Sequence, residues 1–469
     1  MLNPADNTFA ARLTDAGIAV RAATPAYREE LRGRYVGTSE HVAVPADTAQ
    51  ISTLVHLCNE ARVGLVPFGG GTGLVGGQIS TSEPPPIVVS LERLTRIRAT
   101  YVLENTIVAE AGVTLGTLQG AAFASDRLFP LSYASKDSAQ IGSALAVNSG
   151  GLNVLRYGTA RDLCLGVEAV LPNGEILHGL KRLRKDNTGY DLRNLLIGSE
   201  GTLGIITAAA LKLSPLPAHK ATAFIAVASP QSALDLLNLV QQQVPDGLSA
   251  FELISGQSFA FLRETHGDIR LPFETDPDWA ALIEIGTGPG TDPDAIIAEV
   301  YERANTAGLV GEARLSQSAQ QRDAFWSVRE TIPDANRRIG AIASHDIALP
   351  LSEVPAFLIT ATAQLNRLFP MRINAFGHLG DGNLHYNIFP PRGETKAAYQ
   401  DRAEAATRLI HDLVMERGGT FSAEHGIGRA KVAELARYGD PAKLAAMTAI
   451  KRSLDPNGIM NPGTVLPAL

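Results

Sequence analysis

Between residues 43 and 67 the spacing of hydrophobic and polar residues changes twice along the chain. This pattern predicts a strand, a helix and a second strand. Thr48 is the expected N-cap of the helix, because a hydroxyl can accept a hydrogen bond from the first turn. Ile51, Leu54 and Val55 then fall on one helical face, as in a helix that packs against a core. A strand followed closely by such a helix is typical of a mixed α and β domain.

Short apolar runs continue the strand pattern towards the middle of the chain. Residues 87–91 and 106–111 each read as a buried strand. Residues 166–171 and 175–177 predict a β-hairpin, because Pro172-Asn173-Gly174 between them is a turn sequence. The first half is therefore expected to build its core around sheets.

A break is expected at Ser214-Pro215-Leu216-Pro217, where two prolines interrupt both helix and sheet. Beyond it, strand patterns at 221–227 and 282–285 alternate with helical patterns at 231–243 and 294–305. This alternation predicts an antiparallel sheet backed by helices, so the fold class is α+β. Two further stretches look helical. They are residues 9–33, expected to form an N-terminal helical arm, and the helix-rich region 396–454.

Composition and charge narrow the classes of function. Of 469 residues, 45% are hydrophobic and 19% charged, as in an ordinary soluble protein, and the net charge of −7 argues against a nucleic-acid partner. No apolar stretch reaches the roughly 20 residues of a membrane helix, and the N-terminus lacks the order of a signal peptide. Cys58 and Cys164 stand in apolar surroundings that favour free thiols. We therefore expect no transmembrane segment and a cytoplasmic location.

A glycine run follows the second predicted strand. Gly71, Gly73 and Gly76 match G-x-G-x-x-G, but the dinucleotide fingerprint needs a helix directly afterwards, and residues 78–86 end in three prolines. Successive glycine N–H groups still form an anion-binding nest, so residues 69–73 are expected to bind a pyrophosphate without a helix. The alternative is a flexible surface loop.

Two more stretches of small residues, 141–151 and 194–206, offer backbone against which a flat ring system can lie. Tight turns or close helix packing are the alternatives for either stretch alone. In order and spacing, the three stretches resemble the FAD-binding domain of the vanillyl-alcohol oxidase/PCMH flavoprotein family over residues 38–216. The resemblance implies that FAD is held by Pro67, Gly69, Gly70, Gly71, Thr72, Gly73, Ser138, Gly142, Asn148, Gly151 and Ile205. No histidine occurs between His56 and His178, so the FAD is expected to be non-covalent.

Two glycine-flanked clusters near the C-terminus combine imidazoles with a carboxylate. The first carries His378 and His385, and the second carries Glu424 and His425. Three such groups suit zinc or a similar divalent ion and leave the fourth for proton transfer. If residues 384–388 form a strand, Asn387 lies on the same face as His385. The alternative is a set of turn histidines packed against glycines.

Residues 217–469 resemble the FAD-linked oxidase C-terminal domain of D-2-hydroxyacid dehydrogenases, including the final Gly458-Ile459-Met460-Asn461-Pro462-Gly463-Thr464. The resemblance implies that His378, His385 and Glu424 are the metal ligands and His425 is the base. It also implies that Arg329 binds the substrate's carboxylate, and Asn387, on the same strand face as His385, is expected to bind the substrate too.

A surface ion pair is the alternative reading for Arg329, with Glu330 as its partner. The chain departs from the pattern of D-2-hydroxyglutarate dehydrogenases where a threonine and a lysine help to hold the distal carboxylate. By spacing, Pro333 and Ser344 stand there, and Arg337 and Arg338 are candidates to replace the missing cation.

Together these features predict FAD-dependent, metal-assisted oxidation of a D-2-hydroxy acid (D-lactate, D-2-hydroxyglutarate or similar) to the 2-oxo acid. Electrons are expected to pass to an electron-transfer protein or a quinone, and the protein is expected to be a homodimer. The expected domains are a helical arm (1–37), the PCMH-type FAD-binding domain (38–216) and the substrate- and metal-binding domain (217–469). A metal-independent flavin oxidase of alcohols or phenols that uses O2 is the alternative function, and a non-enzymatic FAD-binding module is a third.

Overall fold

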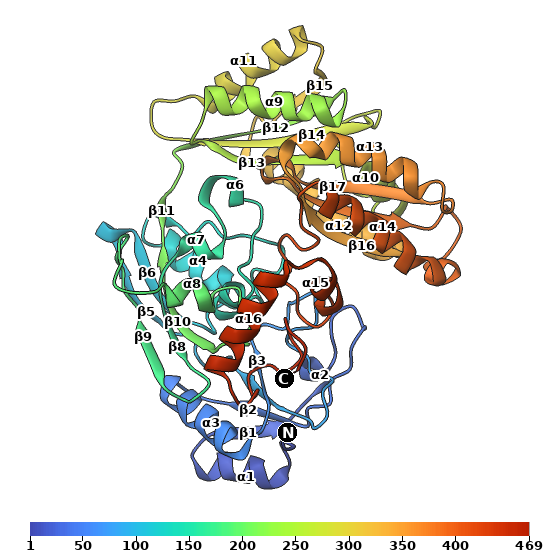
Figure 1. The fold of residues 1–469 in the computed structure, drawn as a ribbon. Helices are drawn as coiled ribbons and strands as arrows, with labels where there is room; N and C mark the ends of the chain where they lie inside the picture. Colours follow the sequence, from blue (N-terminus) through green and yellow to red (C-terminus); the bar gives the residue numbers. More distant parts are fainter. Residues whose placement is uncertain (469) are drawn as a thin grey trace. The chain divides into compact units, whose positions relative to one another are not determined.

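The computed structural model describes residues 1–468, and these form two compact units (Figure 1). The first unit contains Met1–Gly151, Gly158–Leu216 and the chain from Glu424 onwards. The second contains Leu152–Tyr157 and Pro217–Ala423. The expected domains 1–37, 38–216 and 217–469 were defined by function. The two compact units do not test them, so this division stays a prediction.

The first unit has a small sheet next to its N-terminal helices. Its strand order is β1 (Ala19–Ala22), β2 (His41–Val44), β4 (Ile87–Ser90) and β3 (Leu65–Phe68). The last three are parallel and β1 is antiparallel to β2. The predicted strand–helix–strand unit is confirmed, because α3 (Thr48–Ala61) follows β2 and precedes β3 in the chain. The helix buries Ile51, Leu54 and Val55, as expected.

The predicted N-cap of α3 is wrong by one residue. Asp47 is the N-cap and accepts a hydrogen bond from the backbone N–H of Gln50 at 2.8 Å. Thr48 is the first helical residue, and its hydroxyl donates instead to Glu168 at 2.8 Å. Either side chain can cap a helix. Because the Thr48 hydroxyl is bonded to the buried Glu168, it does not cap the helix.

The predicted helix over residues 9–33 is also wrong beyond its first turns. The helix α1 (Asn7–Asp15) ends before Gly17, whose φ of +80° reverses the chain. Residues 19–22 form β1, which pairs with β2, and only the single turn α2 (Pro25–Arg28) follows. Pairing with β2 overrides the weak local preference for helix.

A second sheet of the first unit is wholly antiparallel. Its order is β5 (Ile97–Tyr101), β6 (Thr106–Glu110), β10 (Ile205–Lys212), β8 (Cys164–Val170) and β9 (Ile176–Gly179). The predicted hairpin is confirmed, with Val170 opposite Ile176. The unit is completed by the two-stranded pair β7 (Arg127–Leu128) and β11 (Ser214–Pro215) and by the helices α4 (Leu115–Phe123), α5 (Ile141–Ala146), α7 (Ala160–Leu163), α8 (Leu192–Leu196), α15 (Val432–Tyr438) and α16 (Pro441–Leu454).

The second unit is built on one antiparallel sheet of seven strands. Its order is β15 (Val310–Leu315), β12 (His219–Val227), β14 (Trp279–Thr287), β13 (Leu248–Ser255), β17 (Arg372–His378), β18 (Asn383–Phe389) and β16 (Ala343–Ala348). Every neighbouring pair is antiparallel, so the predicted sheet type and the α+β class are confirmed.

Helices cover both faces of this sheet. One core contains side chains of α9 (Pro230–Gln243), α11 (Pro293–Thr306), α13 (Val354–Leu365) and α14 (Ala403–Glu416). A second core, on the other face, contains side chains of α10 (Gly256–Thr265) and α12 (Ala319–Ile339). The single turn α6 (Val154–Tyr157) also belongs to this unit. The face under α12 carries the polar side chains described below.

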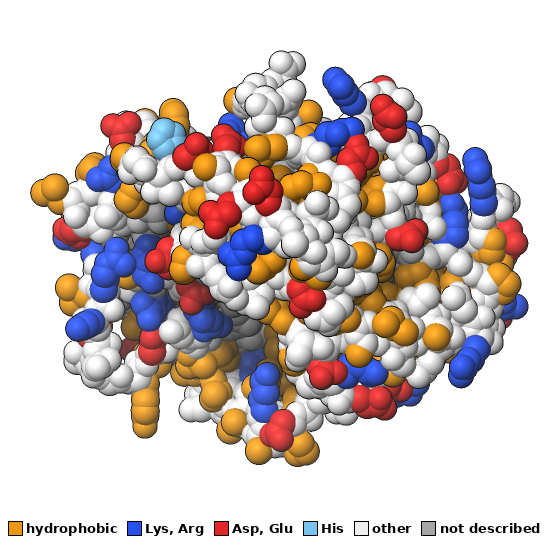
Figure 2. Space-filling model, turned by 90° about the horizontal axis from the view of Figure 1, so that it is seen from above, with side chains coloured by type: hydrophobic (Ala, Val, Ile, Leu, Met, Phe, Trp, Pro, Cys, Tyr) orange, Lys and Arg blue, Asp and Glu red, His pale blue; other side chains and the backbone are white. Residues whose placement is uncertain are grey.

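Over most of the face shown in Figure 2, Lys and Arg side chains lie next to Asp and Glu side chains. Cys58 and Cys164 are both buried and free, as predicted. Within residues 1–468, none of the helices combines the length and the apolar character that crossing a membrane requires.

Candidate functional site

The first unit contains a cavity of about 450 Å³ at the carboxyl end of β3. The three predicted small-residue stretches come together around it: the loop after β3, the start of α5 and the turn before β10. The predicted cofactor residues that line it are Pro67, Gly69, Gly71, Thr72, Gly73, Gly142 and Ile205. Its volume is in the range of cavities that hold cofactors.

No helix follows the glycine run within residues 71–86, as predicted. The loop is instead shaped by contacts between backbones. A Cβ at Gly70 would lie 1.9 Å from the carbonyl oxygen of Ser138, and a Cβ at Gly142 would lie 2.6 Å from the Cβ of Ala111 and 3.1 Å from its carbonyl oxygen. Glycine at these positions permits this close approach and leaves room beside the backbone for a flat ring, which fits FAD.

Four predicted cofactor residues do not line the cavity. Gly70 and Ser138 pack against one another through their backbones. Asn148 has a φ of +53°, and its Oδ1 accepts a hydrogen bond from the N–H of Arg161 at 2.9 Å. Gly151 approaches the carbonyl of Ser132, which a Cβ would meet at 2.3 Å. These positions shape the segments around the cavity.

Glu200 lines the cavity and was missed by reasoning from the sequence. Its Oε1 accepts from the N–H of Ile427 at 2.7 Å, and its Oε2 accepts from the N–H of Gly428 at 2.8 Å. Burial raises the pKa of Glu200 to about 7, against the effect of these two hydrogen bonds. The only local signal in the sequence was its place in Gly198-Ser199-Glu200-Gly201, where the structure gives Glu200 a φ of +52°.

The carboxylate of Glu200 fixes the loop that carries His425. Gly426 has a φ of +75° and passes so close that a Cβ would lie 2.7 Å from Glu200 Oε1. The N–H groups of Arg429 and Ala430 both donate to the carbonyl of Val75, at 2.9 and 3.1 Å. Glu424 and His425 line the cavity as a result. Tyr133 is a further lining residue, and its burial raises its pKa to about 12.

In the second unit, the two predicted metal-binding histidines lie on adjacent strands. His378 ends β17, and His385 lies in β18 opposite Phe376. Their ring centroids are 5.8 Å apart. Asn387, two residues after His385 on the same face, accepts through Oδ1 from the N–H of His345 at 3.2 Å. The predicted strand over 384–388 is confirmed.

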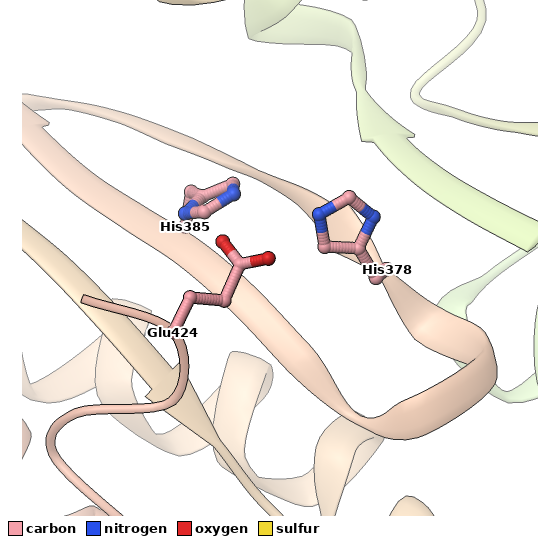
Figure 3. A group of neighbouring side chains, drawn as sticks. All are labelled: His378, His385 and Glu424. Carbon is pink, nitrogen blue, oxygen red and sulfur yellow. The ribbon is translucent and has the colours of Figure 1, made fainter. Parts of the chain in front are cut away.

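Glu424 directly follows a segment that is tied to β16. The N–H of Ala423 donates to the carbonyl of Asp346 at 3.2 Å. One ligand atom each of His378, His385 and Glu424 lies within 4.8 Å of the others, and Figure 3 shows the carboxylate directed towards both rings. Imidazole and carboxylate at this spacing suit a divalent ion.

Asp346 is an additional acidic group at this place. Asp346, Glu424 and His425 also lie close enough to share an ion. Asp346 is buried opposite His385, and its Oδ1 accepts from Asn383 Nδ2 at 2.9 Å. Nothing in its sequence neighbourhood marked it, because β16 is separated from both histidine clusters along the chain.

Arg329 is buried in α12 and is not the surface ion pair with Glu330 that was the alternative. It is 4% exposed, and its Nε donates to Oε2 of Glu252 in β13 at 2.7 Å. The other oxygen of Glu252 lies 2.6 Å from Nδ1 of His378. Burial alone would raise the pKa of Glu252, but the charges of Arg329 and His378 outweigh it and lower the pKa to about 2.

The residues expected to replace a distal-carboxylate cation are otherwise engaged. Arg337 and Arg338 both form ion pairs with Asp334 and are exposed. Pro333 lies inside α12, and Ser344 is opposite Asn387 in the pairing of β16 with β18. Neither Arg337 nor Arg338 is therefore a free cation for a substrate.

Comparisons with known proteins agree with this arrangement. A family model described as "FAD linked oxidases, C-terminal domain" matches residues 216–465, and one described as "FAD binding domain" matches residues 39–179. Among solved structures, p-cresol methylhydroxylase with substrate bound superimposes with a TM-score of 0.76, covering 98% of this chain and 96% of that one. At 16% identity, this similarity establishes the fold alone.

Curated relatives are similar over most of their length. The mitochondrial D-2-hydroxyglutarate dehydrogenase of Arabidopsis thaliana is 33% identical over 435 residues, which are 92% of this chain and 76% of the relative. The D-2-hydroxyglutarate dehydrogenase of Stutzerimonas stutzeri (strain A1501) is 33% identical over 446 residues, 94% of each chain. With the two-domain match and the cavity at its glycine loop, the chain belongs to the FAD-linked oxidase family and is an FAD-linked oxidoreductase.

Proposed function

We propose that the protein oxidises a D-2-hydroxy acid to the corresponding 2-oxo acid with non-covalent FAD and a divalent metal, zinc by its ligand set. The observation that carries this proposal is the convergence of His378, His385 and Glu424, with ligand atoms within 4.8 Å of one another. The residue after Glu424, His425, lines the cavity that fits FAD. The names of the relatives support the substrate class.

The residues around the cavity fit FAD, and the cluster of His378, His385 and Glu424 fits a divalent metal ion. FAD would be held by the glycine loop at residues 69–73 together with the start of α5, and a metal ion by the two imidazoles and Glu424. Bound FAD supplies the oxidant for the C2 hydrogen and its electron pair, and a divalent ion supplies a Lewis acid that makes the hydroxyl more acidic.

The chain's own residues bind the substrate and move its proton. The guanidinium of Arg329 is held through Nε, and among residues 1–468 none accepts a hydrogen bond from its Nη groups. Those groups suit the C1 carboxylate of a 2-hydroxy acid, because arginine binds carboxylates with a pair of parallel hydrogen bonds. The imidazole of His425 accepts the proton of the C2 hydroxyl as that oxygen becomes a carbonyl.

Two features bear on which acid is used. The relatives' names favour D-2-hydroxyglutarate. The engagement of Arg337 and Arg338 with Asp334 leaves a distal carboxylate without those partners, which favours a shorter acid such as D-lactate. An electron-transfer protein or quinone as acceptor, the homodimer and the cytoplasmic location stay predictions from the sequence.

Anaerobic bleaching of the flavin tests the proposal. The D isomers of 2-hydroxyglutarate and lactate are mixed with the FAD-loaded protein, with the L isomers as controls, and the flavin absorbance is followed. At least one D isomer is expected to bleach the flavin, and bleaching by L isomers only would overturn the proposal.

Metal removal separates the proposal from the alternative. After treatment with a chelator, bleaching by the D acid is expected to slow by at least about 100-fold and to recover with zinc, because loss of a Lewis acid removes several kcal/mol of stabilisation. A metal-independent oxidase of alcohols or phenols would instead keep its O2 consumption after the same treatment.

A further inference from the structure

Glu252 is a buried carboxylate whose two oxygens contact His378 and Arg329. It is 1% exposed in β13, and its neighbours in the strand, Phe251 and Leu253, belong to the apolar core of the opposite face. A lone carboxylate in such a place is costly unless both oxygens are satisfied by charged or donating partners. Its two oxygens have different partners, and both bear on the proposed reaction.

The first oxygen fixes the imidazole of His378. Oε1 lies 2.6 Å from Nδ1, so a neutral ring carries its proton on Nδ1 and leaves Nε2 as the electron-pair donor. A carboxylate behind the far nitrogen of a ligand histidine sets its tautomer and orientation and raises its basicity. Glu252 and His378 are also opposite one another in the pairing of β13 with β17, which fixes the distance between their backbones.

The second oxygen fixes the guanidinium of Arg329. Oε2 accepts from Nε at 2.7 Å, and the guanidinium carbon lies 4.8 Å from the centroid of the Phe376 ring. The plane is therefore held from one edge and one face. Phe376 and His378 lie two residues apart in β17, so the same short stretch of strand positions both the guanidinium and the imidazole.

We propose that Glu252 is a positioning residue that aligns, through its two carboxylate oxygens, the metal-binding imidazole of His378 and the carboxylate-binding guanidinium of Arg329. This inference rests on the function proposed above and deepens it. According to this inference, a single residue that is distant in sequence from both groups sets the distance between the metal and the substrate's carboxylate.

Glu252→Gln is the sharpest test, because glutamine keeps the shape but offers one acceptor and one donor where both partners donate. On the full-length, FAD-loaded and metal-stripped protein, zinc affinity is measured by competition with a chromophoric chelator. We expect it to fall by about 10- to 100-fold, as for other partners of ligand histidines. With zinc restored, KM for the D acid that bleaches the flavin is expected to rise by about tenfold or more.

Glu284→Gln is the matched control. Glu284 is a buried glutamate of the neighbouring strand β14 that accepts from Trp326 Nε1 at 2.7 Å. It faces no proposed metal ligand, so zinc affinity and KM should both stay at the wild-type values. If Glu252→Gln fails to retain FAD, Glu252→Asp, which keeps the charge but shortens the reach, is measured in the same way with the same expected direction.

The outcomes separate the two levels of the proposal. Wild-type protein that binds zinc no better than His378→Ala would remove the metal from the proposed function. Wild-type protein that binds zinc well, together with Glu252 variants of equal affinity and KM, would overturn the role of Glu252 alone.

Discussion

At the scale of single residues, the approach of one backbone to another shapes the cavity. A Cβ at Gly70 would lie 1.9 Å from the carbonyl oxygen of Ser138 and 2.7 Å from its carbonyl carbon. Both are backbone atoms, so no rotation of a side chain relieves the overlap. The glycine loop keeps its distance from the segment before α5 only with glycine at this position.

Gly70→Ala is therefore expected to weaken FAD binding by roughly tenfold or more, because overpacking costs about 1–3 kcal/mol and each 1.4 kcal/mol is about tenfold in affinity. The measurement is the FAD retained after gel filtration, followed by titration with added FAD. Gly120→Ala is the control, since that glycine is exposed in α4 with no atom within 4 Å of a new Cβ. Equal FAD affinity in the two variants would contradict the argument.

The residues that could be predicted from the sequence are those with a local signal. His378, His385, Glu424 and His425 stand in short glycine-flanked clusters, and the loop at 69–73 is itself a run of glycines. The buried glutamates lacked such a signal because their partners are remote. Glu252 and His378 are 126 residues apart in sequence, and Glu200 and Ile427 are 227 apart.

At the scale of elements, one buried lysine ties α16 to the rest of the first unit. The Nζ of Lys451 donates to the carbonyls of Thr202 and Met460, both at 2.8 Å, and to Asp455 Oδ2 at 2.5 Å. Burial lowers the pKa of Lys451, although the charge of Asp455 opposes this. The last turn of α16 is thereby joined to the turn before β10 and to residues beside β3.

Lys451→Met should destabilise the protein by about 3 kcal/mol, because it leaves the carboxylate of Asp455 buried without its cation. The measurement is the unfolding midpoint in guanidinium chloride, followed by fluorescence. Lys443→Met changes an exposed lysine of the same helix and is expected to shift the free energy of unfolding by less than about 0.5 kcal/mol. A similar loss in both variants would show that the buried contacts contribute little.

Elements were predictable where their own residues decide them. The hairpin of β8 and β9 follows from the turn residues between its strands, and α3 follows from the spacing of its apolar residues. The strand β1 was missed because its pairing with β2 decides its structure. Its four residues, three of them exposed, carry no alternating pattern of their own.

At the scale of the whole molecule, the chain passes from the first unit to the second and back more than once. The return at Glu424 brings the final residues, with α15 and α16, into the first unit. The proline-rich break before residue 217 was visible in the sequence. The return at Glu424 was not, because composition does not change there and the contacts that define it, such as Glu200 with Ile427, are long-range.

Because of these contacts, FAD binding is thermodynamically coupled to the folding of the first unit. The glycine loop, the start of α5, Glu200 and the segment at 424–425 all line the cavity, so FAD stabilises segments remote in sequence against unfolding. FAD at about 100 times its dissociation constant is expected to add about 2.7 kcal/mol to the free energy of unfolding. Calorimetry of the protein with and without FAD measures this as a rise in unfolding temperature.

Acid precipitation of the same holoprotein tests how FAD is attached. His425 is the single histidine among the described residues that line the cavity, and its proposed role as a base requires an unmodified ring. Acid precipitation of the holoprotein is therefore expected to release all the flavin into the supernatant, and FAD added to the apoprotein should restore the higher unfolding temperature. His425→Ala is the control, because it removes the proposed base and should leave release unchanged. Flavin that stays with the precipitated wild-type protein but not with His425→Ala would show a covalent bond to that ring, and His425 could not then accept the substrate's proton.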